Sequence, residues 1–213
     1  MGNFSFEMVK VEAGSFYLGN GLSNRVTITR DYYIGKYEVT QELYDIVMGT
    51  NPSHFKGYDR PVEEVSWNEA TEFCAKLSRM TGKHFSLPTE AEWEWAARGG
   101  KKSKGYKYAG SSNVDEVCWY YENSGGQSHP VGRLKPNELG IYDMSGNVDE
   151  WCQDWYSEYS EKEYTDPMGP ARGKSRVYRG GTFSVIGGTR ITSRYGTDPD
   201  KKDYARGFRI VMH

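Results

Sequence analysis

The spacing of hydrophobic and polar residues divides this chain into a strand-rich start, a helical middle and an irregular remainder. From Phe4 to Ile34, apolar and polar residues alternate around several glycines, which is typical of short strands joined by turns. The clearest alternation runs from Val26 to Thr29. After residue 100 the helical spacing disappears, and Gly, Ser, Asn and aromatic residues predict turns and brief strands. Val177-Tyr178 and the apolar run from Phe208 to Val211 are expected to close the chain as strands.

Three helices are predicted in the middle of the chain. A short helix follows Thr40, because apolar residues then recur at helical spacing. Ser66 and Thr89 each begin a capping box, in which a hydroxyl group and a Glu three residues later satisfy free backbone N–H groups. The first box predicts a helix that stops at Gly82, and the second a helix that stops at Gly99-Gly100.

The same spacing predicts which helical side chains are buried. The apolar face of the longer helix, which we expect in the core, comprises Ala70, Phe73, Cys74, Leu77 and Met80. Three carboxylates of the next helix are spread around its axis and are interpreted as a solvated face: Glu90, Glu92 and Glu94.

Composition limits the function classes. The chain has 213 residues, with 27 Lys+Arg against 29 Asp+Glu, so no strong field of one sign attracts nucleic acid or an anionic membrane. No apolar run is long enough to span a bilayer, and Met1 to Lys10 does not resemble a signal peptide. We therefore expect a soluble monomer of one domain that binds no nucleic acid and does not insert into membranes. Its compartment stays open: cell surface or secreted if an export signal was trimmed.

Metal and thiol chemistry find little support in the residue spacing. The three cysteines form no CxxC pair and are interpreted as small buried hydrophobic residues: Cys74, Cys118 and Cys152. The four histidines are scattered and are interpreted as surface or capping residues: His54, His84, His129 and His213. Lysines between Lys101 and Lys107 predict a solvated loop. The long irregular stretch from Tyr156 to Arg172 is typical of functional or mobile segments.

Six separated motifs, in order from about Met8 to the C-terminus, resemble the formylglycine-generating-enzyme (sulfatase-modifying factor) family. They are Tyr33 to Thr40, Arg60-Pro61-Val62 with Val65-Ser66-Trp67, Leu87 to Glu94, Gly140 to Val148, Arg179-Gly180-Gly181, and Gly207-Phe208-Arg209. The resemblance implies an α+β, C-type-lectin-like fold that is loop-rich and covers residues 1–213 as one domain. It also implies a bacterial protein.

The family's chemistry does not carry over with the fold. Its enzymes use two C-terminal cysteines that bind copper and activate oxygen, but Thr182 to Arg206 contains no cysteine. Ser, Thr, Val and Ile cannot replace thiolates around a soft metal. We therefore expect no enzyme activity, no required cofactor and no copper. A sulfoxide synthase is not expected either, since the additional helical domain of those relatives is missing. An oxidoreductase that acts on sulfatase cysteines remains the alternative.

The resemblance also implies a calcium site. Asn147, the Val148 carbonyl and Glu150 match the family pattern, although Asp149 stands where the family usually has Trp. The alternative interpretation of Asn147 is a turn residue whose side chain bonds nearby backbone.

The C-terminal segment, residues 180–209, suggests a binding surface. Tyr and Phe offer contact area at low entropic cost, and Ser, Thr and Gly offer adaptable polar contacts. The segment is similar to the variable region of proteins diversified by retroelements. A reverse-transcriptase gene beside a near-copy of its coding region would identify such a protein. The candidate ligand-binding residues are Phe183, Ser184, Val185, Ile186, Thr189, Ser193, Tyr195, Thr197, Lys202, Asp203 and Tyr204.

The leading hypothesis is a non-catalytic protein that binds an unknown protein or glycan ligand through this segment. An accessory domain of a larger surface assembly is the third hypothesis. Ordinary loop and strand residues without a binding role are the simplest explanation of the segment.

Overall fold

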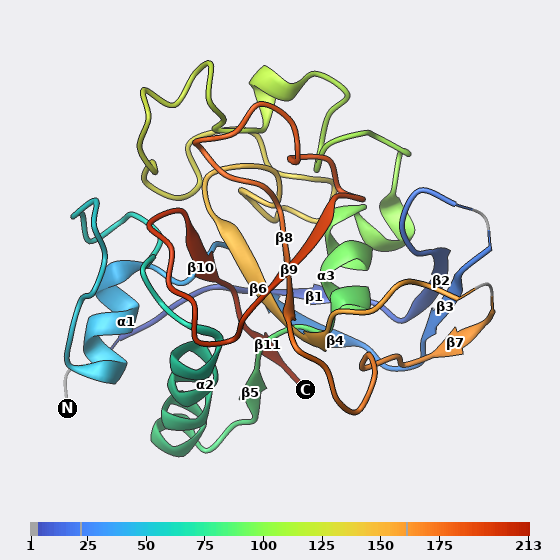
Figure 1. The fold of residues 1–213 in the computed structure, drawn as a ribbon, viewed down its shortest axis with the longest axis horizontal. Coiled ribbons are helices and arrows are strands. Elements are labelled where there is room, and N and C mark those ends of the chain that lie inside the picture. The colour runs from blue at the N-terminus through green and yellow to red at the C-terminus, as the bar shows by residue number, and fades with distance from the viewer. Residues whose placement is uncertain (1–3, 22, 161) are drawn as a thin grey trace.

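The computed structural model describes residues 4–21, 23–160 and 162–213 and shows the expected α+β fold (Figure 1). Its strands form three small sheets among the described residues. The central sheet has the order β10-β6-β8-β9. Its strands are β6 (Asp149–Trp155), β8 (Arg176–Arg179), β9 (Arg194–Thr197) and β10 (Arg206–Phe208). β10 pairs parallel to β6, whereas β8 pairs antiparallel to both β6 and β9, so β9 is an edge strand.

Two further sheets combine strands of the first 35 residues with strands from later in the chain. The order β1-β4-β11-β5 joins β1 (Met8–Val11), β4 (Tyr32–Gly35), β5 (Phe85–Ser86) and β11 (Val211–Met212). The order β2-β3-β7 joins β2 (Gly14–Tyr17), β3 (Arg25–Ile28) and β7 (Tyr164–Thr165). The strands predicted near Val26 and Val177 are confirmed. The C-terminal apolar run is divided between β10 and β11, because the chain passes from one sheet to another there.

The three predicted helices are confirmed together with their capping residues. They are α1 (Gln41–Met48), α2 (Trp67–Thr81) and α3 (Glu90–Ala97). Thr40 caps α1, and Ser66 and Thr89 form complete capping boxes with the N3 Glu of their helices. Gly82 ends α2 in the left-handed conformation. The predicted core face of α2 is buried except for Met80, which is 39% exposed because it lies in the last turn.

The interpretation of the α3 carboxylates as a solvated face is wrong. Glu90, Glu92 and Glu94 are 4%, 8% and 0% exposed, because α3 runs through the interior and every one of its residues is buried. Glu94 binds Arg98 and the fully buried Arg179, and Glu90 accepts hydrogen bonds from Arg194. Glu90 and Glu94 therefore pair with Arg194 and Arg179, which lie far away in the sequence, whereas Glu92 bonds the cap residue Thr89 and His213.

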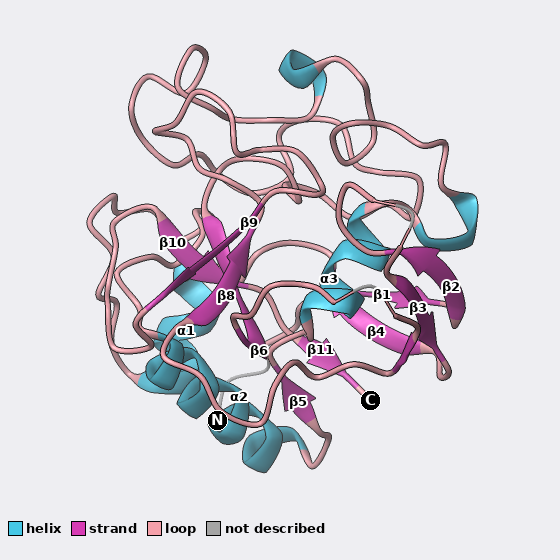
Figure 2. Ribbon diagram, turned by 45° about the vertical axis from the view of Figure 1, so that its right-hand side comes forward, coloured by secondary structure: helices cyan, strands magenta, loops and turns pink. Residues whose placement is uncertain are grey.

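Loops form a large part of the molecule, as the loop-rich half of Figure 2 shows. Between α3 and β6 the described chain contains only the 3-10 turns η1 (Gly100–Lys102) and η2 (Val114–Glu116). The lysines between Lys101 and Lys107 are exposed in this region, as predicted. Within the described residues, no helix is both long enough and apolar enough to cross a membrane.

A buried ion pair connects the central sheet to α3, to β4 and to the loop before β6. Arg209, fully buried after β10, donates from Nε and Nη2 to the two carboxylate oxygens of Glu150 in β6 at 2.8 and 2.7 Å. Its remaining donors reach the carbonyl oxygens of Gly35 and Tyr142, and Trp93 of α3 donates to Glu150 at 2.7 Å. A charge without a partner is very costly inside a protein, so this pairing strongly constrains the fold.

We expect Arg209→Met to lower the free energy of unfolding by about 3–5 kcal/mol, because it leaves the Glu150 carboxylate buried without a counter-ion. Urea unfolding followed by tryptophan fluorescence measures the change. The matched control is Lys76→Met, which removes the exposed pair with Glu72 on α2 at 3.3 Å, and there we expect a loss below about 0.5 kcal/mol. Equal losses in the two variants would contradict the central role of the Arg209 pair.

Candidate ligand-binding surface

The candidate ligand-binding residues lie on β9 and on the two loops that flank it. β9 is the edge strand beside β8 in the central sheet, and the loops 181–193 and 198–205 continue from its two ends (Figure 1). The first loop connects β8 to β9, and the second connects β9 at one edge of the sheet to β10 at the other edge, so the segment starts and ends in the same sheet.

Exposure divides the candidate residues into two groups. Four large side chains reach solvent: Val185, Ile186, Tyr195 and Tyr204 are 40%, 72%, 42% and 45% exposed. Lys202 is exposed, and the partly exposed polar members are Ser184, Ser193, Thr197 and Asp203. These nine residues are called the C-terminal surface below. Phe183 and Thr189, at 0% and 3% exposed, lie beneath it and cannot contact a ligand in this structure.

The buried Phe183 supports Tyr204. Their ring centroids are 5.9 Å apart, and Phe55 packs edge-on against both rings at 5.5 and 6.3 Å. His54 approaches the Tyr204 ring at 6.3 Å from the same neighbouring loop. Aromatic pairs at these separations favour tilted or edge-to-face contacts, so Tyr204 is held against a packed cluster and presents its outer part to solvent.

Tyr195 is supported in the same way by the central sheet. It lies opposite Tyr178 in the β8–β9 register, and the two rings stack at 5.5 Å. The guanidinium of Arg206 lies 4.1 Å from the Tyr178 ring centroid and 4.9 Å from that of Trp151. A layer of aromatic rings and a cation therefore supports the exposed tyrosine.

The loop after β9 is attached to the start of α2. Lys202 pairs with Glu69 at 2.5 Å, and the backbone N–H groups of Glu64 and Trp67 donate to the Asp203 and Pro199 carbonyls at 3.0 and 2.9 Å. The loop after β9 contains no helix or strand, but these contacts hold it against the start of α2.

Tyr121 is a surface residue that sequence reasoning missed. It is 60% exposed, and its backbone N–H donates to the Val185 carbonyl at 3.3 Å, which brings it beside the C-terminal surface. The signal was the aromatic run Trp119-Tyr120-Tyr121, which stands alone in a stretch without periodicity.

The cysteines are free and buried, and burial raises the pKa of Cys74 and of Cys118 to about 12. Burial also raises the pKa of Cys152 well above its ordinary value. Thiols in this state supply little thiolate near neutral pH. Among the described residues, no three His, Cys, Asp or Glu side chains are grouped to hold a metal ion.

The residues predicted to bind calcium do not fit such a site as the structure arranges them. Asn147 accepts a hydrogen bond from the His129 backbone and donates to Glu38, and both Glu150 oxygens bind Arg209. Asn147 has a positive φ of 61° and adopts the turn role that was its alternative interpretation. A cation would have to displace a guanidinium group from Glu150.

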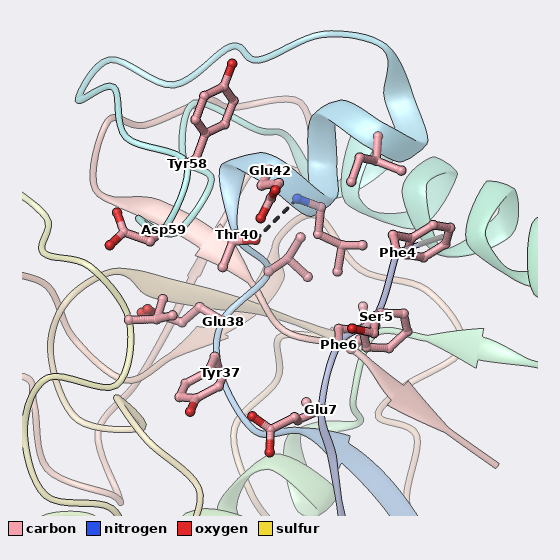
Figure 3. Close-up of a pocket in the computed structure, with 16 residues that line it drawn as sticks. Phe4, Ser5, Phe6, Glu7, Tyr37, Glu38, Thr40, Glu42, Tyr58 and Asp59 are labelled. Atoms are coloured by element: carbon pink, nitrogen blue, oxygen red, sulfur yellow. Dashed lines mark hydrogen bonds between the residues drawn. The ribbon is translucent and has the colours of Figure 1, made fainter. Parts of the chain in front are cut away.

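The cavity in Figure 3 lies away from the C-terminal surface. It measures about 580 Å³ and lies between the segment around Phe4 to Glu7, the start of α1, and Tyr58-Asp59. Its described lining contains no cysteine, no histidine and no member of the C-terminal surface. This cavity therefore provides no thiol chemistry of the formylglycine-generating type.

Known proteins place the chain in a family. The model of the sulfatase-modifying factor enzyme 1-like domain matches residues 4–213. Over 212 residues, the chain is 40% identical to chaperone protein LppX of Paenibacillus barcinonensis, with 76% of each chain covered. It is 37% identical to a formylglycine-generating enzyme of Streptomyces coelicolor, covering 72% of this chain but only 52% of that enzyme.

Solved structures show the same fold. Treponema denticola variable protein 1 superposes with a TM-score of 0.93 at 34% identity, and the match covers 99% of this chain and 96% of that one. CarF superposes with a TM-score of 0.78 at 26% identity, covering 98% of both chains. Both resemblances drawn from the sequence, to the formylglycine-generating enzymes and to the variable proteins, are thus confirmed. The chain belongs to the sulfatase-modifying factor enzyme 1-like domain family.

Proposed function

We propose that the chain is a non-catalytic binding protein that presents the C-terminal surface to a protein or glycan ligand. The observation that carries this proposal is the pairing of exposed aromatic side chains with buried aromatic supports at two places, Tyr195 on Tyr178 and Tyr204 on Phe183. Rigid aromatic anchors flanked by adaptable polar groups are the usual composition of a binding surface.

The likeness to a variable protein supports a finer proposal, that residues 180–209 form a variable segment. The structural match to Treponema denticola variable protein 1 extends over 99% of this chain. The exposed side chains lie on loops and on an edge strand, where substitution disturbs few buried contacts. The interior arginines and carboxylates would remain unchanged beneath such variation.

A buried acid and a buried arginine tie the two ends of this segment together. Asp149 of β6 accepts a hydrogen bond from the Gly181 backbone at 3.1 Å, at the start of the segment. Arg206, at its end, lies opposite Asp149 in the β10–β6 register, with its Nη2 4.0 Å from an Asp149 oxygen and 3.8 Å from Asp203. The pair holds the segment as a closed loop on the central sheet.

An oxidoreductase of the formylglycine-generating type is the competing function, because relatives with 35–37% identity are such enzymes. The non-catalytic proposal is supported by the three buried thiols, whose raised pKa disfavours the thiolates that copper needs.

We expect Tyr195→Ala and Tyr204→Ala each to weaken ligand binding by about 10- to 100-fold, as for central aromatic anchors. Wild type and variants are screened side by side on a glycan array and a surface-protein library, and affinities for each hit are measured by biolayer interferometry. Tyr17→Ala is the matched control, since Tyr17 on β2 is 43% exposed but lies in another sheet. Hits that bind all variants equally would refute this surface.

We expect Asp149→Asn to remove a pH dependence of stability. Burial raises the pKa of Asp149 to about 7, although Arg206 opposes the shift. The folded protein therefore binds the proton more tightly than the unfolded chain, and stability falls as pH rises from about 4 to about 7. Between pH 5 and pH 8, the wild type should lose on the order of 1–3 kcal/mol relative to Asp149→Asn. Urea titrations at both pH values measure this difference, and parallel curves would contradict it.

We expect no formylglycine when the protein is incubated with copper, oxygen and a cysteine-containing sulfatase peptide. The reason is that thiolates must bind the metal, and the cysteines here are buried and protonated. Mass spectrometry of the peptide detects the aldehyde product, with an active formylglycine-generating enzyme as the positive control. Any copper-dependent product would restore the enzymatic hypothesis.

A further inference from the structure

A second cavity is bordered by Arg194 of β9 and by the long irregular segment after β6. It measures about 390 Å³ and is lined by Leu18 just after β2, by the start of α3 and by the segment between Trp155 and Pro170. Its walls are mainly apolar and aromatic, including Leu18, Ala91, Tyr159 and Met168. This volume is in the range of sites that bind small molecules.

One carboxyl group inside this cavity has an oxygen without a partner. Asp154 is 5% exposed, and its Oδ2 accepts the Glu90 backbone N–H at 2.8 Å at the start of α3. Its Oδ1 accepts no hydrogen bond from any other residue that the structure describes, and beyond the Glu90 N–H only the backbone N–H of Asp154 itself donates toward this carboxyl. Gly169 packs closely against this side chain, since a Cβ added there would lie 2.9 Å from the Asp154 Cβ and 3.2 Å from Oδ1.

The cations near Asp154 make their close contacts with other groups, and Arg176 interacts with the Asp154 charge only at longer range. Arg194 donates to both Glu90 oxygens at 2.7 and 2.9 Å, and Arg176 lies between the rings of Trp67 and Trp155 at 3.7 and 3.5 Å. Lys162, at the cavity wall, places its ammonium 4.9 Å from the Tyr164 ring centroid. Asp154 forms no ion pair with any described residue. A buried carboxylate normally has such a partner.

We propose that this cavity binds a small amine whose ammonium group meets Asp154 Oδ1 and whose apolar body packs against Trp155, Met168 and Leu18. An ammonium group supplies both the hydrogen-bond donor and the charge that the carboxylate lacks. Aromatic walls add attraction for a cation, and Lys162 over Tyr164 shows that the rim already accommodates one ammonium group. This site is independent of the C-terminal surface.

Because Asp154 can lose a proton near neutral pH, the affinity of the site for an amine should depend on pH. Burial, and then the charge of Glu90, raise the pKa of Asp154 to about 7. The charged groups that face it are Glu90, Glu92 and Arg176, with Glu158, Lys162 and Arg194 on the cavity wall. Only the ionised carboxylate pairs with an ammonium group. Amine affinity should therefore rise about tenfold from pH 6 to pH 8, as the carboxyl loses its proton.

The test is a titration of the full chain, labelled with ¹⁵N, with benzylamine and with its uncharged analogue benzyl alcohol. We expect benzylamine to shift the amide signals of Glu90, Asp154 and Gly169, with about tenfold tighter binding at pH 8 than at pH 6. Benzyl alcohol should bind at least tenfold more weakly and without pH dependence. Equal binding of the two probes, or no shift at these residues, would overturn the proposal.

Two variants distinguish the contribution of the Asp154 carboxylate to binding from the contribution of the cavity. Asp154→Asn keeps an oxygen for the Glu90 N–H but loses the charge, so benzylamine affinity should fall at least tenfold and its pH dependence should vanish. Met168→Trp, at a residue 60% exposed, fills the cavity from its rim without touching the helix cap and should also abolish binding. Glu72→Gln on α2, with a carboxylate side chain 56% exposed, is the control for loss of one negative charge and should bind as wild type. Unchanged affinity in Asp154→Asn would refute the proposed contact.

Discussion

The fold depends on buried arginine–carboxylate pairs that join segments far apart in the chain. Arg209 and Glu150 connect the C-terminal strands to β6, and through Trp93 and the Gly35 and Tyr142 carbonyls they also hold α3, β4 and a loop. Arg179 and Glu94 make a second such link between β8 and α3. With so little regular structure, hydrophobic packing alone defines few unique neighbours, whereas a buried charge tolerates only its own partner.

This arrangement separates the buried ion pairs from the exposed candidate binding surface. The motif residues Arg179 and Arg209 are fully buried, while Ile186, Tyr195 and Tyr204, which lie between them in sequence, are exposed. Substitution at the exposed positions leaves the ion pairs intact, whereas substitution at the buried positions breaks an ion pair and destabilises the folded state. A family whose relatives include both enzymes and a variable protein can therefore keep one scaffold while its surface chemistry changes.

Local signals in the sequence were sufficient for the helices and insufficient for the interior charges. Ser66 and Thr89 predicted helix starts correctly because a capping box is completed within four residues. Glu94 was misinterpreted because its partner Arg179 lies 85 residues away, and helical spacing reports only direction around the axis. The same limit applies to Asp154, whose significance comes from a cavity that three distant segments build. The composition of the C-terminal segment predicted a surface, but without periodicity it could not separate the buried Phe183 from its exposed neighbours.

Asp149, where this chain departs from the motif that the family resemblance implies, acts together with Arg206. A tryptophan, which the family resemblance implies at this position, could neither accept the Gly181 N–H nor offer Arg206 a negative charge. Asp149 does both, and Arg206 in turn lies against Tyr178, on which the exposed Tyr195 stacks. Asp149 is therefore connected to the exposed Tyr195 by a chain of contacts through Arg206 and the Tyr178 ring. Through Gly181 and Arg206, Asp149 contacts both ends of the segment that carries that surface.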